Sequence, residues 1–159
     1  MNIEEILDSI GDKLYNFLTI KLGSPLDAED VLQEVFCRLV RYKVRFRFIR
    51  NPSAYVFRMA RNEAISYIKH RNKNLKSHHS VEGLSEVIKN NLTGSDPELL
   101  NQTAEALAKI PADQREVIVL KFFEELTFRE ISDVCHVSIG TVTSRYRYGM
   151  EKLRKLLED

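Results

Sequence analysis

Apolar residues recur along this chain at intervals of three and four, the spacing that places them on one side of an α-helix. The pattern predicts helices over residues 3–18, 27–40, 53–68, 99–108 and 113–123. Gly23, Ser24 and Pro25 interrupt it, and so does Pro111. Ser53 is the expected N-cap of the third helix. The segment 42–51 is basic and aromatic with weak periodicity, so we expect a loop or a distorted turn there.

Residues 127–157 predict a helix-turn-helix with an unusually long second helix. Thr127 and Glu130 have capping-box spacing, His136 lies in a short turn, and Ser138 can cap the next helix. One side of that helix is apolar. The opposite side carries Gly140, Ser144, Arg147 and Glu151. Such a helix suits the major groove of DNA, although an ordinary amphipathic helix pair with a solvated face is the alternative.

The composition changes between residues 72 and 96, where Asn, Ser, Lys, His and Gly are common and apolar residues are scattered. This change predicts a flexible linker, with room for a short helix near residues 84–88. Six glycines and four prolines in 159 residues argue against a turn-rich β fold. We therefore predict an all-α protein with two small helical domains, 1–72 and 96–159, joined by a linker over 73–95. The C-terminal domain carries the helix-turn-helix.

The formal net charge of +1 hides a strong segregation of charge. Residues 1–40 contain eight acids against three bases, whereas residues 41–76 contain eleven bases against the single acid Glu63. A basic block this dense is the electrostatic footprint of a protein that binds a polyanion.

Several other classes of protein are disfavoured. No apolar run approaches membrane-spanning length, and the acidic N-terminus is unlike a secretory signal, so we expect a cytoplasmic protein without membrane insertion. Cys37 and Cys135 are far apart, among apolar helix positions, and we expect both to be buried, reduced thiols. His78 and His79 lie in the predicted linker and are not a metal site.

No motif predicts an enzyme. The chain has no phosphate-binding glycine loop, no recognisable nucleophilic arrangement and no metal-ligand spacing, so we expect no catalytic residue, metal or cofactor. Asp27, Glu29, Asp30 and Glu34 form an acidic cluster on a predicted helix. Metal binding is conceivable for these carboxylates, but a solvated acidic face or a docking surface for a basic partner is the better interpretation.

Aromatic residues alternate with cations inside the basic block. Phe46 and Phe48 are interleaved with Arg45 and Arg47, and in this poorly periodic segment we expect both rings to be exposed. Cations that follow phosphates and rings that stack on bases are what a binder of unpaired DNA needs. Phe57, and with it Tyr55, belongs to the core instead. The polar side of the third helix carries further candidates, Arg58, Arg61 and Asn62.

At the level of motifs, the chain resembles a bacterial RNA polymerase sigma factor of the sigma-70 family, in the small extracytoplasmic-function (ECF) group. Residues 27–36, DAEDVLQEVF, resemble region 2.2, and residues 54–67 resemble regions 2.3 and 2.4. Residues 110–117, IPADQREV, resemble the start of region 4, and Glu130-Ile131 with residues 139–145 resemble its helix-turn-helix. The motifs cover nearly the whole chain and fall in the family's order.

The resemblance implies a dissociable subunit that binds core RNA polymerase, directs promoter recognition and helps to open DNA. The implied polymerase-binding residues are Asp27, Asp30, Gln33 and Glu34. Those near the melted −10 element are Arg45, Phe46, Arg47, Phe48, Arg58, Arg61, Asn62 and Ser66. Those implied to read the duplex −35 element are Thr141, Thr143, Ser144, Arg145, Arg147 and Tyr148. An anti-sigma factor is a further implied partner.

Some positions depart from the family's pattern. Tyr55 stands where tryptophan is usual, Ser66 replaces an Asp or Asn, and His136 occupies a turn position that often holds glycine. Thr143 and Tyr148 stand where basic residues are frequent, which bears on the promoter sequence that is read. Two other functions remain as alternatives. One is a regulator that binds duplex DNA without polymerase, and the other is a sigma-like decoy that binds polymerase without supporting initiation.

Overall fold

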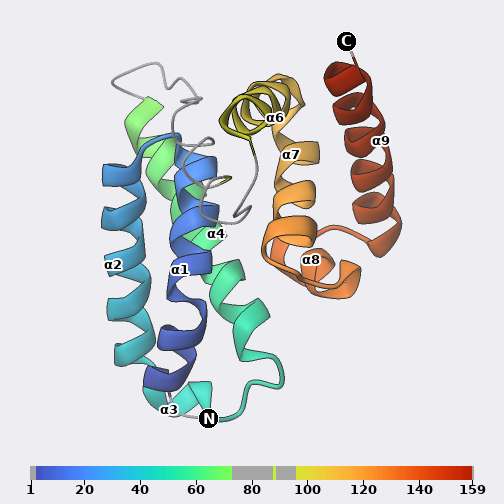
Figure 1. Ribbon diagram of the computed structural model, residues 1–159. Coiled ribbons are helices and arrows are strands. Elements are labelled where there is room, and N and C mark those ends of the chain that lie inside the picture. The colour runs from blue at the N-terminus through green and yellow to red at the C-terminus, as the bar shows by residue number, and fades with distance from the viewer. Residues whose placement is uncertain (1–2, 73–87, 89–95, 159) are drawn as a thin grey trace.

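The structure is a computed structural model that describes residues 3–72, 88 and 96–158, and over these residues it is all-α, as predicted. Figure 1 shows the described helices in two groups. The first group contains α1 (Ile3–Leu22), α2 (Pro25–Arg41), α3 (Lys43–Phe46) and α4 (Pro52–Asn72). The second contains α6 (Pro97–Lys109), α7 (Ala112–Ile118), the π-helical turn η1 (Val119–Phe123), α8 (Phe128–Cys135) and α9 (Ile139–Glu158).

The first group is a three-helix bundle in which α1, α2 and α4 all pack against one another. Its centre contains Leu14, Leu18, Val35 and other apolar side chains that are fully buried. Phe17 of α1 meets Phe57 of α4 edge to face, with ring centroids 5.8 Å apart. Such a pair adds about 0.5–1.5 kcal/mol to the stabilisation from burial. The bundle therefore holds the polar faces of α2 and α4 at its surface.

The second group forms around α7, which packs against α9, while α8 packs against α9 and α6 lies against the same long helix. Gly149 lets α9 cross α7 closely, because a Cβ there would lie 2.8 Å from Ile118 Cδ1. Arg115 is buried and ties α7 to the end of α6. Its guanidinium donates to the backbone carbonyls of Leu107 and Ile110, each at 2.8 Å, and to that of Ala108 at 3.2 Å.

Two helix starts differ from the predictions. The second helix begins at Pro25, not Asp27, because Ser24 accepts from the Asp27 amide and caps it. The α4 helix begins at Pro52, and the Asn51 side chain accepts from the Ala54 amide at 3.1 Å, so Asn51 and not Ser53 takes the capping role. In both cases a proline at the first helical position extends the helix toward the N-terminus.

The structure also corrects the prediction for one cysteine. Cys135 is buried as expected, but Cys37 is exposed on the outer side of α2. The predicted linker, including the possible short helix at 84–88, lies outside the described residues apart from Ile88, whose side chain is buried. Among the described residues, no helix is long and apolar enough to cross a membrane.

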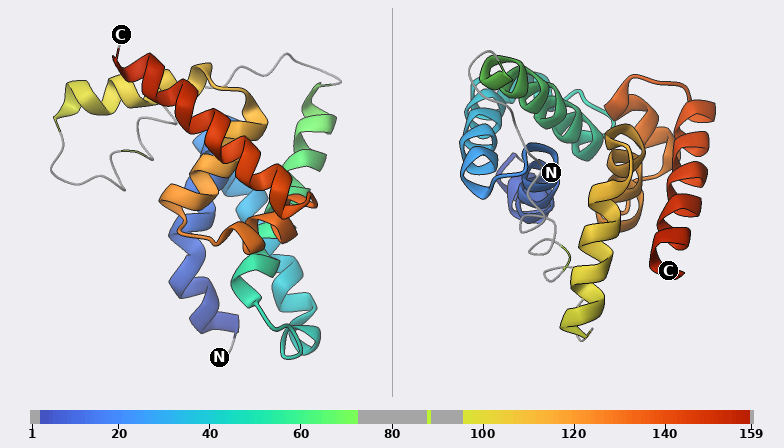
Figure 2. Two further views of the ribbon diagram at one scale, coloured as in Figure 1. Left: turned by 90° about the vertical axis from the view of Figure 1, so that its right-hand side faces the viewer. Right: turned by 90° about the horizontal axis from the view of Figure 1, so that it is seen from above.

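The two groups of helices contact each other chiefly through α4 and α8. The view from above in Figure 2 shows α8 and α7 beside α4 and α1, with α9 on the far side of the second group. The contact brings the polar side of α4, which contains candidate DNA-binding residues, next to the helix-turn-helix.

Candidate nucleic-acid and protein interfaces

The helix-turn-helix consists of α8 and α9. A complete capping box starts α8, since the Glu130 amide donates to Thr127 Oγ1 and the Thr127 amide donates to Glu130 Oε1. His136 ends the helix in the left-handed conformation, at φ 56°, which explains why glycine is common at this kind of position. Ser138 then caps α9 by accepting from the Thr141 amide at 3.1 Å. These caps agree with those expected from the sequence.

The candidate −35 residues lie along the first half of α9. Thr143, Arg147 and Tyr148 are exposed, while Thr141, Ser144 and Arg145 are half-buried. The Arg147 guanidinium lies over the Tyr148 ring, 5.0 Å from its centroid. Arg145 is turned toward α7, where its Nε lies 3.5 Å from Asp113 Oδ2. Thr143, Arg147 and Tyr148 therefore place a hydroxyl, a guanidinium and an aromatic ring on the solvent-exposed face of α9.

The segment that precedes α4 contains both cations and aromatic rings. Arg45, Arg47 and Phe48 are exposed, and the Phe48 side chain is 84% exposed. Phe46 is only 6% exposed and meets the Tyr55 ring edge to face at 6.3 Å. The prediction that Phe46 is an exposed stacking ring is therefore wrong. Phe46 is the last residue of α3 and enters the core, whereas Phe48 lies in the turn that follows and remains in solvent.

The polar side of α4 divides into two parts. Asn62 and Ser66 are exposed to solvent. Arg58, which is also exposed, and Arg61, which is half-buried, each contact the second group of helices. The Arg58 Nε donates to His136 Nε2 at 3.1 Å, and the Arg61 Nε donates to Glu116 Oε1 at 2.8 Å.

The candidate polymerase-binding residues of α2 also fall into two sets, one paired with α4 and one exposed. Asp27 accepts a 2.7 Å hydrogen bond from the Tyr67 hydroxyl and pairs with Arg71, so its carboxylate ties α2 to the end of α4. The hydrogen bond to Asp27, together with burial, raises the pKa of Tyr67. The remaining candidates, Asp30, Gln33 and Glu34, are exposed.

Further charged groups surround that exposed face. Glu34 Oε1 lies 3.2 Å from Arg38 Nε, and Arg38 also pairs with Glu63 of α4 at 2.5 Å. Asp30 and Glu34 line a shallow hollow between α2 and α4, with Ser66 on its other wall. The described residues contain no group of three or more His, Cys, Asp or Glu side chains that could hold a metal ion.

A buried carboxylate that was not anticipated from the sequence lies between the two groups of helices. Glu116 of α7 pairs with Lys21 of α1 and Arg61 of α4, and it accepts a hydrogen bond from the Cys135 thiol at 3.2 Å. Burial alone would raise the pKa of Glu116, but Lys21 and Arg61 outweigh burial and hold the pKa below its usual value. Burial and the nearby Glu116 charge raise the pKa of Cys135 to about 12.

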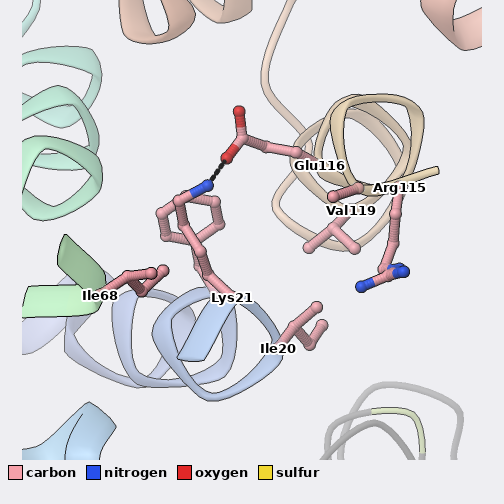
Figure 3. A pocket seen from close by; sticks show the side chains of 8 residues that line it. Ile20, Lys21, Ile68, Arg115, Glu116 and Val119 are labelled. Carbon is pink, nitrogen blue, oxygen red and sulfur yellow. Dashed lines mark hydrogen bonds and ion pairs between the residues drawn. The ribbon is translucent and has the colours of Figure 1, made fainter. Parts of the chain in front are cut away.

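Figure 3 shows the pair formed by Lys21 and Glu116 at the edge of a cavity of about 120 Å³. Ile20, Ile68 and Val119 contribute apolar walls from the two sides. A signal for the buried role of Glu116 does exist in the sequence, because it directly precedes four consecutive apolar residues, 117–120, in a predicted helix. A helix that is apolar on nearly every side has few directions left that point to water.

A second buried acid, Glu124, follows η1. Its side chain is 3% exposed, and neither carboxylate oxygen has a hydrogen-bond partner. Burial raises the pKa of Glu124 to about 8, with Lys13 of α1 opposing the shift and Glu125 adding to it. The acid is therefore largely neutral at physiological pH.

Comparisons with known proteins place the chain in a family. Residues 6–74 match Sigma-70 region 2, and residues 106–155 match Sigma-70, region 4. The chain is 33% identical to the ECF RNA polymerase sigma factor SigW of Bacillus subtilis, over 98% of this chain and 88% of that protein. It is 28% identical to the RNA polymerase sigma factor CarQ of Myxococcus xanthus, over 97% of this chain and 88% of that protein.

A solved structure shares the fold. The sigma factor RpoE of Bartonella quintana, in complex with the anti-sigma factor NepR, matches with a TM-score of 0.79 and 22% identity, over 98% of this chain and 96% of that chain. The helical motifs, their order and the relatives together confirm the resemblance inferred from the residues. The chain belongs to the sigma-70 family of RNA polymerase sigma factors, in its extracytoplasmic-function group.

Proposed function

We propose that this sigma factor engages core polymerase and its promoter through three separate surfaces. The exposed acidic face of α2 (Asp30, Gln33 and Glu34) binds the polymerase, and Asp27 fixes that face by tying α2 to α4. The basic segment 45–48 and the polar side of α4 contact the −10 element. The first half of α9 enters the major groove at the −35 element.

The exposed Phe48 is the observation that carries the −10 proposal. An aromatic side chain that is 84% exposed gives up the stabilisation that burial would provide, and it stands between exposed arginines. Stacking on an unpaired base recovers that apolar contact, and the arginines neutralise the adjacent phosphates. A duplex offers no free base face to such a ring, so this segment acts on melted DNA.

The −35 proposal rests on the arrangement of Arg147 and Tyr148. The ring supports the guanidinium at 5.0 Å on the exposed side of α9, which limits the orientations that the arginine samples. A guanidinium held in this way is suited to a bidentate contact with a guanine edge. Arg145 contacts a phosphate after it leaves Asp113.

Two helical domains, 1–72 and 96–159, suit contacts with the −10 and −35 elements respectively, since these elements are separate on DNA. The site of action is the cytoplasm, where core polymerase is found. An anti-sigma factor is a further proposed partner, which is supported by the shared fold with a sigma factor solved in complex with the anti-sigma factor NepR.

Transcription in vitro tests the proposal. Core polymerase with this protein on fragmented genomic DNA, followed by mapping of RNA 5′ ends, should reveal start sites that core polymerase alone does not use. The Phe48→Ala variant should then open DNA poorly at these sites, measured by permanganate reactivity of unpaired thymines, with a loss of about 1–3 kcal/mol per unstacked base. Leu99→Ala, another exposed apolar residue, is the matched control.

The outcomes separate the functions. Absence of any new start site contradicts sigma activity in this chain. Tight, sequence-specific footprints on duplex DNA by the pure protein would instead favour a regulator that works without polymerase. Normal opening by Phe48→Ala would remove the ring from the −10 contact.

A further inference from the structure

The end of the three-helix bundle at α3 carries an apolar surface that the proposed −10 contact does not explain. Four of the ten large apolar side chains that are exposed among the described residues lie within residues 40–48. They are Val40, Tyr42, Val44 and Phe48, which are 60%, 47%, 74% and 84% exposed. Tyrosine and phenylalanine can stack on bases, but valine has no ring. A contact with unpaired DNA therefore gives the two valines no apolar partner.

Cations surround these apolar side chains. Residues 41–50 contain five cations and no acid, and all five are exposed: Arg41, Lys43, Arg45, Arg47 and Arg50. Within the described part of the chain, none of the five pairs with a carboxylate, whereas Arg38, Arg61 and Arg71 each do. The acids Glu4 and Glu5 begin α1 at the same end of the bundle, where the cations outnumber them.

Residues 40–50, here called the tip, form an ordered structure. The Arg45 amide donates to the Tyr42 carbonyl at 3.0 Å, and the Phe48 amide donates to the Arg45 carbonyl at 3.2 Å. Phe46 anchors the tip to the core, where its ring meets that of Tyr55. Such internal pairing matters at an apolar boundary, because unpaired backbone groups are costly there.

We propose that the tip binds the surface of an anionic phospholipid bilayer. Its exposed apolar side chains enter the boundary between headgroups and acyl chains, while its cations pair with lipid phosphates. Hydrocarbon gives Val40 and Val44 the apolar contact that neither water nor a DNA strand offers. Figures 1 and 2 show α3 at the end of the bundle away from α6 and α9, so a flat surface can approach the tip along the bundle.

Tryptophan fluorescence tests the contact, because the chain contains no tryptophan of its own. The emission of Val44→Trp should shift to shorter wavelength when vesicles of equal parts phosphatidylcholine and phosphatidylglycerol are added. Lipids brominated on the acyl chain should quench it, and vesicles of phosphatidylcholine alone should leave it unchanged. Leu99→Trp, at an exposed position on α6, is the matched control and should show no shift.

Tryptophan itself favours membrane interfaces, so the parent protein must also bind. The parent should sediment with the mixed vesicles and stay in the supernatant with phosphatidylcholine alone. Higher salt should release it. Soluble glycerol 3-phosphate carries the same phosphate group without an acyl chain, and it should not compete at a matched concentration of phosphate.

The cations are tested by a double substitution outside the proposed −10 surface. Arg41→Gln with Lys43→Gln should weaken vesicle binding about fivefold for each cation removed. Lys152→Gln with Arg154→Gln removes the same charge from the exposed side of α9 and should bind like the parent. Equal losses in the two double variants would show that net charge, and not the tip, drives the binding, which overturns the proposal.

The other adverse results are also distinct. A parent that does not sediment with the mixed vesicles would show that the bilayer contact does not exist. Sedimentation without quenching by brominated lipid would show that the apolar side chains stay in water. Emission that responds to a single-stranded oligonucleotide but not to vesicles would assign the tip to nucleic acid alone. None of these results contradicts the −10 proposal, which Phe48→Ala tests separately in transcription.

Discussion

Substitution of Glu124 by glutamine should alter how the stability of the protein depends on pH. Glu124 is buried without a hydrogen-bond partner, and its pKa rises from 4.5 in a solvated chain to about 8 in the fold. The fold therefore retains a proton that the unfolded chain loses at lower pH. The stabilisation from this proton is complete below about pH 4.5 and is lost as the pH rises through about 8.

The size of the effect follows from the shift in pKa. Each unit corresponds to about 1.4 kcal/mol, so the free energy of unfolding should fall by about 4–5 kcal/mol between about pH 4.5 and about pH 8 through Glu124. Glutamine has nearly the same shape and carries no charge. Glu124→Gln should therefore equal the parent in stability near about pH 4.5 and exceed it by up to about 4–5 kcal/mol above about pH 8.

Urea unfolding followed by far-ultraviolet circular dichroism at several pH values measures this difference. Glu105→Gln removes an exposed carboxylate from the same group of helices and should leave the pH dependence of the parent unchanged. Parallel pH profiles for Glu124→Gln and the parent would refute the reasoning. Such a result would mean that the carboxylate reaches water or a partner in the folded protein.

Three further substitutions test the packing and the proposed DNA-reading role of α9. Arg115→Met removes the donors to three backbone carbonyls at the end of α6, so the free energy of unfolding in urea should fall by about 3 kcal/mol. An unchanged free energy of unfolding would mean that water satisfies these carbonyls. Gly149→Val forces side-chain atoms against Ile118, and thermal unfolding should show a cost of about 1–3 kcal/mol unless α9 can shift away. Arg147→Ala should weaken use of the −35 element by about 1–3 kcal/mol in transcription assays. Arg154→Ala, farther along α9, should have no such effect. Equal effects of the two substitutions would mean that Arg147 does not contact a base.

Helix-level features of this protein follow from local rules, which explains why they could be predicted. The capping box of Thr127 and Glu130 and the cap at Ser138 depend on residues three positions apart, so the sequence pattern alone determines them. The α4 start was predicted at the wrong residue because Asn51 and Ser53, two positions apart, can both cap a helix, and Pro52 at the first helical position favours Asn51.

The exposure of individual rings could not be predicted in the same way. Phe46 and Phe48 have the same composition around them, and both alternate with arginines. They differ in exposure because Phe46 is the last residue of α3 and contacts the Tyr55 ring, whereas Phe48 lies in the turn that follows. Weak periodicity in this segment left the direction of each side chain undetermined.

Contacts between the two helical groups were the least predictable feature. Lys21, Arg61 and Glu116 are distant in the sequence, and no spacing rule connects them. The charge segregation showed that residues 41–76 attract anions, but it did not show whether the anion is DNA or a carboxylate of the same chain.

That ambiguity has a physical consequence for the function. A helix that must bind phosphate needs a row of cations, and such a row also attracts any carboxylate that the rest of the chain can bring to it. Arg61 is 18% exposed in its pair with Glu116, so solvent screens this attraction little. Exposed arginines bind nucleic acid without regard to sequence, whereas Arg61 is already engaged by a carboxylate of the same chain. The proposed contact of the Arg61 Nε with the −10 element therefore requires that its hydrogen bond to Glu116 first be broken.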